Sequence, residues 1–253
     1  MKKRSGFTLI EVAIFLAITG ALFVGVAVGT SNSVYQQRFT DSVQNFAEFL
    51  RSVYSEVSNP QSNGKGQSNK ALYGRLITFG ETSASSATGY KVYVYDVIGN
   101  VAGDYGLGSS NLQTILANLN VKAIISGDGY NGLTRSYSTK WGAAIENAGS
   151  STGYRSASVL IVRHPRSGTI YTLVAPNRVV KVQEAFNNNN NPENPLKNAL
   201  TANWFSSNQI DFCISPEHGG ERRQDVRIIK DARNASGVEI IALDDIAQNA
   251  CRQ

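Results

Sequence analysis

The chain has 253 residues, of which 42% are hydrophobic, and its formal net charge at pH 7 is +5. This length accommodates one good-sized domain with an appendage. The three basic residues at positions 2–4 belong to a total of 24, and without them 21 basic side chains face 19 acidic ones. A balance so close to neutral gives little electrostatic reason to expect nucleic-acid binding, so nucleic acid is the least favoured partner.

The first element is a hydrophobic stretch that follows a short basic leader. Residues 1–6 hold three basic side chains, and from residue 7 to residue 29 the one charged side chain is Glu11. A secretory signal peptide has a shorter apolar stretch, about 7–15 residues, whereas a membrane-spanning helix needs about 20. An unpaired carboxylate in hydrocarbon is costly, so Glu11 needs a partner or a role.

These residues resemble the N-terminus of type IV pilins and of the pseudopilins in related secretion and DNA-uptake machines. The match is Lys2-Lys3-Arg4-Ser5-Gly6 followed by Phe7-Thr8-Leu9-Ile10-Glu11. The resemblance implies that a membrane aspartyl peptidase cuts after Gly6, on the cytoplasmic side, and usually N-methylates the new terminus, Phe7. It also implies that Glu11 is the acidic residue that the family carries at its fifth mature position.

The chemistry of the segment fits this role. Basic residues keep the leader in the cytoplasm by the positive-inside rule, so the domain beyond the helix faces outward. Gly6 has no side chain, which lets a protease approach the backbone closely. After cleavage Phe7 carries an ammonium group, and Glu11 is expected to pair with the terminus of a neighbouring subunit during assembly.

The helix is predicted to continue beyond the hydrophobic stretch to about Val57. An apolar stripe at spacings of 4, 3, 4, 3 and 4 residues is typical of an amphipathic helix. Its members are Phe39, Val43, Phe46, Leu50, Val53 and Val57. We expect this stripe to pack on the chain's own domain, with a partner helix as the alternative, and Ser58-Asn59-Pro60 to end the helix.

The remainder predicts a domain built from short strands. Seven runs read as strands: Leu76–Phe79, Tyr90–Ile98, Ser158–Arg163, Thr169–Val174, Ile210–Ile214, Val226–Ile229 and Val238–Leu243. Residues 164–168 are typical of a hairpin turn. Leu112–Leu119 predicts a short helix, and residues 61–70, 99–110 and 186–195 predict loops.

The expected fold class is therefore α+β, with a long N-terminal helix whose amphipathic half packs on a mostly antiparallel sheet. The pilin family has this plan. The expected division is a leader at 1–6, a transmembrane or filament-core helix at 7–30, its amphipathic continuation at 31–58 and a globular head at 59–253.

Signals for a cofactor or a metal are weak. The run from Gly127 to Gly132 fits G-x-G-x-x-G, but Leu133–Lys140 lacks the apolar helical face that a dinucleotide site needs. His164 and His218 have no nearby cysteine or acidic pattern for zinc, and Asp244-Asp245 lacks EF-hand spacing. We predict no catalytic residue, no cofactor and no metal, and read the chain as non-enzymatic.

Two further surface motifs carry little weight. The basic cluster of Arg222, Arg223, Arg227 and Lys230 predicts a solvated face rather than an anion site. Asn234-Ala-Ser236 fits a glycan acceptor, a triplet that is common by chance.

The two cysteines, Cys213 and Cys251, both lie in the last fifth of the chain. An even, sparse count in a secreted domain suggests a disulfide, and the alternative is two buried thiols. The resemblance adds weight to the bridge, because many pilins close a C-terminal loop in this way. We expect Cys213 and Cys251 to be paired.

The functional prediction is a structural subunit of a type IV filament machine, a minor pilin or pseudopilin, since major subunits tend to be shorter. The alternatives are a filament-borne adhesin or DNA-uptake subunit whose head binds a ligand, and a membrane-anchored enzyme. Expected partners are other pilin subunits, the prepilin peptidase, the inner-membrane assembly platform and, before assembly, membrane lipid. The expected location is the bacterial inner membrane, with one span and the head outside the cytoplasm, and then the filament.

Overall fold

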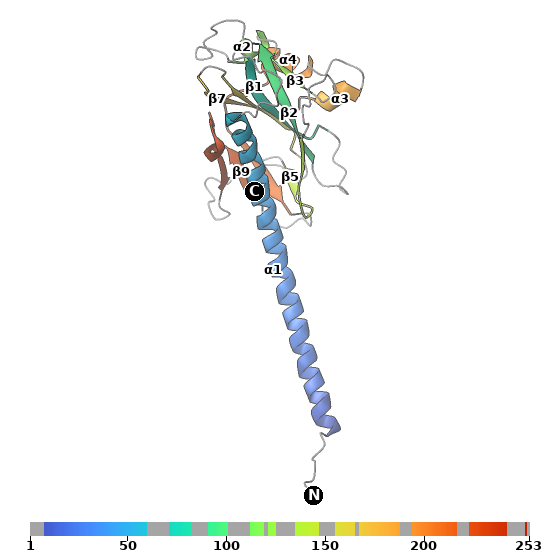
Figure 1. Ribbon diagram of the computed structural model, residues 1–253. Helices are drawn as coiled ribbons and strands as arrows, with labels where there is room; N and C mark the ends of the chain where they lie inside the picture. Colours follow the sequence, from blue (N-terminus) through green and yellow to red (C-terminus); the bar gives the residue numbers. More distant parts are fainter. Residues whose placement is uncertain are drawn as a thin grey trace. The chain divides into compact units, whose positions relative to one another are not determined.

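The fold is α+β, as predicted: one long helix precedes strands that all pair antiparallel (Figure 1). The computed structural model describes residues 8–59, 71–81, 91–100, 112–118, 121–124, 135–146, 155–164, 167–187, 194–216, 223–241 and 251. The chain divides into two compact units, residues 1–41 and residues 42–253. We call the second unit the head.

Helix α1 spans Leu9–Ser58 without a break, which confirms the predicted continuation beyond the hydrophobic stretch. The Asn59 amide still donates to the Ser55 carbonyl, at 2.9 Å, so the last turn is complete. Pro60 follows directly in the sequence and disfavours helical geometry at the residue before it.

The first sheet contains six strands in the order β3-β2-β1-β6-β7, with β4 pairing to β2 as well. The bounds are β1 Ala71–Phe79, β2 Lys91–Asn100, β3 Lys122–Ile124, β4 Arg135–Ser138, β6 Ala157–Arg163 and β7 Ile170–Pro176. β6 and β7 form the predicted hairpin, in which Gly168 takes a positive φ of 69°. β4 falls in a run that we did not predict as a strand, because its Arg-Ser-Tyr-Ser sequence has little apolar character.

The second sheet contains four strands in the order β10-β9-β8-β5. The bounds are β5 Ala144–Glu146, β8 Ile210–Ser215, β9 Gln224–Ile228 and β10 Val238–Ile241. The expected antiparallel sheet is thus present as two sheets, and the chain passes between them three times: from β4 to β5, from β5 to β6 and from β7 to β8.

The head part of α1 packs against both sheets. The stripe residues Val43, Phe46, Leu50, Val53 and Val57 are all 1% exposed or less, so the stripe packs on its own domain as predicted. The Phe46 ring lies 6.2 Å from the ring of Phe79 on β1 and 5.6 Å from that of Phe212 on β8. The helix is therefore held by aromatic contacts to each sheet.

Ion pairs add to this packing at the last turns of α1. The carboxylate of Glu56 lies 3.3 Å from Nε of Arg75 on β1 and also binds the guanidinium of Arg135 on β4. Arg75 in turn binds Asp96 on β2. A network of several partly buried charges is more stabilising than one exposed pair.

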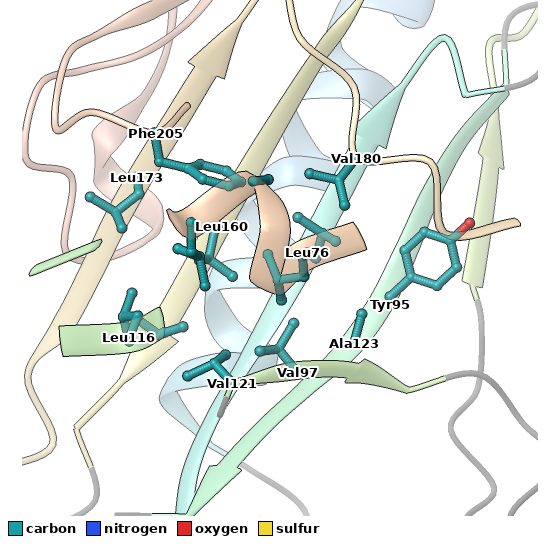
Figure 2. Close-up of a cluster of buried hydrophobic side chains, with 14 of the residues drawn as sticks. Leu76, Tyr95, Val97, Leu116, Val121, Ala123, Leu160, Leu173, Val180 and Phe205 are labelled. Carbon is teal, nitrogen blue, oxygen red and sulfur yellow. The ribbon is translucent and has the colours of Figure 1, made fainter. Parts of the chain in front are cut away.

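A second hydrophobic core covers the opposite face of the first sheet (Figure 2). Three short helices belong to this side of the head: α2 Leu112–Asn118, α3 Val182–Asn187 and α4 Asn194–Thr201. A cross-strand row of Tyr95, Leu76, Leu160 and Leu173 lies in register beneath residues of α2 and α4. Because this sheet is covered on both faces, β6 is buried at successive positions from Ala157 to Val162 rather than at alternate ones.

The predicted helix at 112–119 is present as α2, whereas α3 and α4 were not predicted. The loop expected at 186–195 is wrong at both ends, since residues 186–187 belong to α3 and residues 194–195 to α4. The loop expected at 99–110 is wrong at its start, since residues 99–100 belong to β2. Residues 188–193, most of the asparagine run, lie outside the described residues, as do residues 61–70 and 101–110. The asparagine-rich composition concealed the two helices because their apolar contacts fall at only a few positions.

A buried carboxyl group fixes the start of α3. Glu81 follows β1 and accepts hydrogen bonds from the hydroxyls of Thr78 at 2.7 Å and Tyr95 at 2.6 Å. It also accepts from the backbone amide of Gln183 in the first turn of α3. Burial raises the pKa of the Glu81 carboxyl, and these hydrogen bonds oppose the rise.

Candidate functional site

The N-terminal part of α1 is the candidate site, because it presents apolar side chains without cover from its own chain. None of the 18 residues in Leu9–Val26 is buried, and Leu9 and Phe23 are 87% and 78% exposed. In water such a surface is unfavourable by about 25 cal/mol per Å². By length and composition this is the segment of the described chain that can cross a membrane.

Threonine hydroxyls within this apolar segment and just beyond it are satisfied by the helix itself. The hydroxyl of Thr19 donates to the Phe15 carbonyl, and that of Thr30 donates to the Val26 carbonyl at 3.0 Å. A helix in hydrocarbon needs every polar group satisfied within the segment. The threonines are therefore compatible with an apolar environment.

Thr8 and Glu11 close the first turn of α1 reciprocally. The Thr8 amide and hydroxyl donate to Glu11 Oε2 at 2.8 and 2.9 Å, and the Glu11 amide donates to Thr8 Oγ1 at 3.3 Å. This is a capping box, in which two side chains satisfy amides that the helix leaves unpaired. The carboxylate that the sequence marked as unpaired thus has a partner in its own chain.

Thr8 is the residue that sequence reasoning overlooked. The Thr-x-x-Glu spacing of Thr8 and Glu11 is itself a signal for a capping box ahead of an apolar helix. The remaining residues of the predicted processing site, Gly6 and Phe7, lie outside the described residues.

Cys213 and Cys251 form a disulfide, with their Cα atoms 5.3 Å apart. Both cysteines are buried, at 0% and 1% exposed. The bridge ties the C-terminus to β8 in the middle of the second sheet. The pair is thus structural, remote in sequence from the hydrophobic segment.

The basic cluster is not a solvated face at the two arginines that the structure describes. Arg227 binds Asp211 at 2.5 Å and Asp225 at 3.1 Å, and Arg223 lies 3.3 Å from Glu146. Their positive charges are used in ion pairs with acidic residues of the second sheet, which corrects the prediction for these two arginines, whereas Lys230 is exposed, as predicted. Arg222 lies outside the described residues.

The other sequence candidates do not come together. Nδ1 of His164 accepts a hydrogen bond from the Ser167 amide at 3.1 Å inside the β6–β7 turn. Asn234 uses its side-chain oxygen to bind the amide and hydroxyl of Ser236. Residues 125–134, His218 and Asp244-Asp245 lie outside the described residues, among which no metal-binding group of three His, Cys, Asp or Glu side chains occurs.

An open hollow of about 320 Å³ lies between α2 and α4. Its lining residues are Thr114, Ala117, Asn118, Lys197, Leu200 and Thr201. Lys197 is the one ionisable side chain in this lining, so the hollow assembles no acid–base pair.

Comparison with known proteins places the similarity at the same end of the chain. Residues 1–27 match the family model of the prokaryotic N-terminal methylation motif. No curated protein and no solved structure matches the chain.

Proposed function

Because its first 27 residues mark this chain as a prepilin similar to type IV pilins and pseudopilins, we propose that it is a minor pilin or pseudopilin. In this role it is a structural subunit of a type IV filament machine. The N-terminal motif is the observation that carries the proposal. The exposed apolar part of α1 and the separately packed head support it, because they suit a subunit that assembles through its helix.

The proposed life cycle begins in the inner membrane. Lys2, Lys3 and Arg4 keep the leader in the cytoplasm, the Leu9–Val26 segment spans the lipid, and the head lies outside. The prepilin peptidase cuts after Gly6, and the assembly platform then moves the subunit from lipid into the filament. Other pilin subunits replace lipid around the same apolar surface.

Glu11 has two tasks in this proposal. Cleavage after Gly6 leaves the Phe7–Thr8 peptide bond intact, so the Thr8 amide remains available to the capping box. Both hydrogen bonds from Thr8 go to Oε2 of Glu11, and Oε1 is the oxygen that we assign to the Phe7 ammonium of a neighbouring subunit. Pairing would neutralise both charges in the apolar filament core.

The test is mass spectrometry of the mature protein from its native host. We expect the N-terminus at Phe7, with a methylated amine. Gly6→Val is the matched variant: a side chain at the cleaved position should leave the leader attached, whereas Ser5→Ala should be processed normally. A mature terminus beyond about residue 25, at the end of an ordinary signal peptide, would contradict the proposal.

A further inference from the structure

Trp141 is an exposed aromatic side chain on the surface of the head. Its side chain is 49% exposed. Among the described residues of 42–253 it is the one large hydrophobic residue that is exposed. A single exposed apolar residue is ordinary on a protein surface. The backbone at this position makes Trp141 unusual.

Trp141 occupies a tight turn with an unfavourable backbone conformation. Trp141 and Gly142 have positive φ values of 52° and 71°, and the Ala143 amide donates to the Lys140 carbonyl at 3.2 Å. Successive positive φ values are those of a type I′ turn, whose first central position prefers Asn, Asp or Gly. A bulky side chain is disfavoured there.

The rest of the head follows the usual preference. The other described non-glycine residues with positive φ are Asn177, Asn203 and Asp231, the types that tolerate this conformation best. Trp141 is the exception, and its ring is not buried in return. Strain of this kind, when it presents a side chain to solvent, points to a function for that side chain.

The turn lies at the end of the head where α1 enters. Ser42, the first residue of the head, donates its hydroxyl to the Lys140 carbonyl at 3.3 Å and is 1% exposed. The turn that presents Trp141 is thus fixed to the helix. In the sequence, fifteen residues lie between Val26, where the membrane-length segment ends, and Ser42.

The part of α1 between these two residues carries exposed apolar groups. Val34 and Tyr35 are 43% and 58% exposed, and both lie beyond the membrane-length segment. In a filament assembled through the N-terminal helices, as proposed above, this exposed apolar stretch is available to the head of an adjacent subunit. An aromatic side chain on a rigid turn is a typical anchor for such a contact.

We propose that Trp141 is an intersubunit anchor that packs on the helix of an adjacent pilin-type subunit, in the stretch between the apolar segment and the head. The inference depends on the proposed function. The proposed contact is between the Trp141 ring and apolar side chains of that helix. Val34 and Tyr35 of this chain are examples of such side chains. The conformational strain is retained because the exposed ring gains a partner on assembly.

The first test separates folding from assembly. Trp141→Asn places in the turn a residue that prefers its backbone conformation, so the midpoint of thermal unfolding should stay the same or rise. Incorporation into sheared filaments should nevertheless fall by about fivefold or more, as expected for loss of an interface anchor. Ser138→Asn, at an exposed position of β4, is the control and should assemble normally. Normal assembly of Trp141→Asn, or a fall in its unfolding midpoint, would overturn the inference.

The second test identifies the partner. A photo-crosslinking amino acid at position 141, activated in intact filaments, should give an adduct with the N-terminal helix of another pilin-type chain. For a copy of this chain the tryptic peptide would end at Arg38 and contain Val34 and Tyr35. Adducts with lipid, adducts with a head, or the same pattern from position 138 would overturn it. Absence of the chain from filaments would contradict the proposed function instead, so the two failures are distinguishable.

Discussion

The phenolic oxygen of Tyr54 on α1 lies 2.9 Å from the hydroxyl oxygen of Thr172 on β7, and both residues are buried. The Thr172 hydroxyl donates to the Ala232 carbonyl at 2.6 Å, so Tyr54 is the donor in its own bond with Thr172. Burial raises the pKa of Tyr54, which keeps this donor protonated. One relay therefore joins the helix, the first sheet and the segment that follows β9.

Tyr54→Phe tests this relay. The variant removes the first donor and leaves Thr172 bound to Ala232, so we expect a loss of about 1 kcal/mol in the free energy of unfolding. Thr172→Val should cost more, about 2–3 kcal/mol, because it leaves buried groups on both sides without a partner. Urea unfolding of the detergent-solubilised chain measures both variants. Equal losses of unfolding free energy in the two variants would contradict the assigned directions of these two hydrogen bonds.

Glu81 predicts a pH dependence of stability. Since burial raises its folded pKa above the unfolded value of about 4.3, the folded state binds more protons between these two values. The Glu81 contribution to stability is then greatest below the unfolded pKa and falls as the pH rises through the folded pKa.

Glu81→Gln isolates this contribution, because the glutamine does not titrate. The free energy of unfolding of the wild type minus that of the variant should decrease with pH above about 4.3 and then level off. Urea unfolding at a series of pH values gives this difference, in which the other titrating groups cancel. A difference that does not change with pH would contradict the raised pKa.

The buried disulfide should be protected in the folded head. Cys213 and Cys251 are both 1% exposed or less, so reductant should act on them only after unfolding. The two cysteines are 38 residues apart in the sequence, and the chain-entropy model gives about 4 kcal/mol for a closed loop of this length. Replacing both cysteines with alanine should lower the free energy of unfolding by about that amount. Thiol labelling of the native and the urea-unfolded protein checks the protection, and urea unfolding checks the energy. Rapid labelling of the native protein after mild reductant would contradict it.

Two substitutions at Glu11 separate its two proposed tasks. Glu11→Gln keeps an acceptor for the capping box with Thr8 and removes the charge, whereas Glu11→Val removes both. If the charge pairs with a neighbouring terminus, both variants should insert and fold, and both should assemble poorly. Filament incorporation is measured by shearing and immunoblotting. Normal incorporation of Glu11→Gln would show that assembly needs the capping box and not the charge of Glu11.

The sequence by itself determined the features that depend on nearby residues. The hydrophobic stretch, the position of Glu11 within it and the apolar stripe that continues α1 are local patterns. They follow from the order of residues along one helix. The hairpin at residues 164–168 and most strands were likewise visible in short apolar runs between turn residues.

Only the tertiary structure decided which distant segments meet. The division of the strands into two sheets, the bond from Glu81 to α3 and the pairing of Arg227 with Asp211 all join residues far apart in sequence. Such contacts are fixed when many segments pack at once, and no local pattern encodes that choice. Trp141 shows the same limit: no local pattern in the sequence singled it out, whereas the turn between β4 and β5 presents it to solvent.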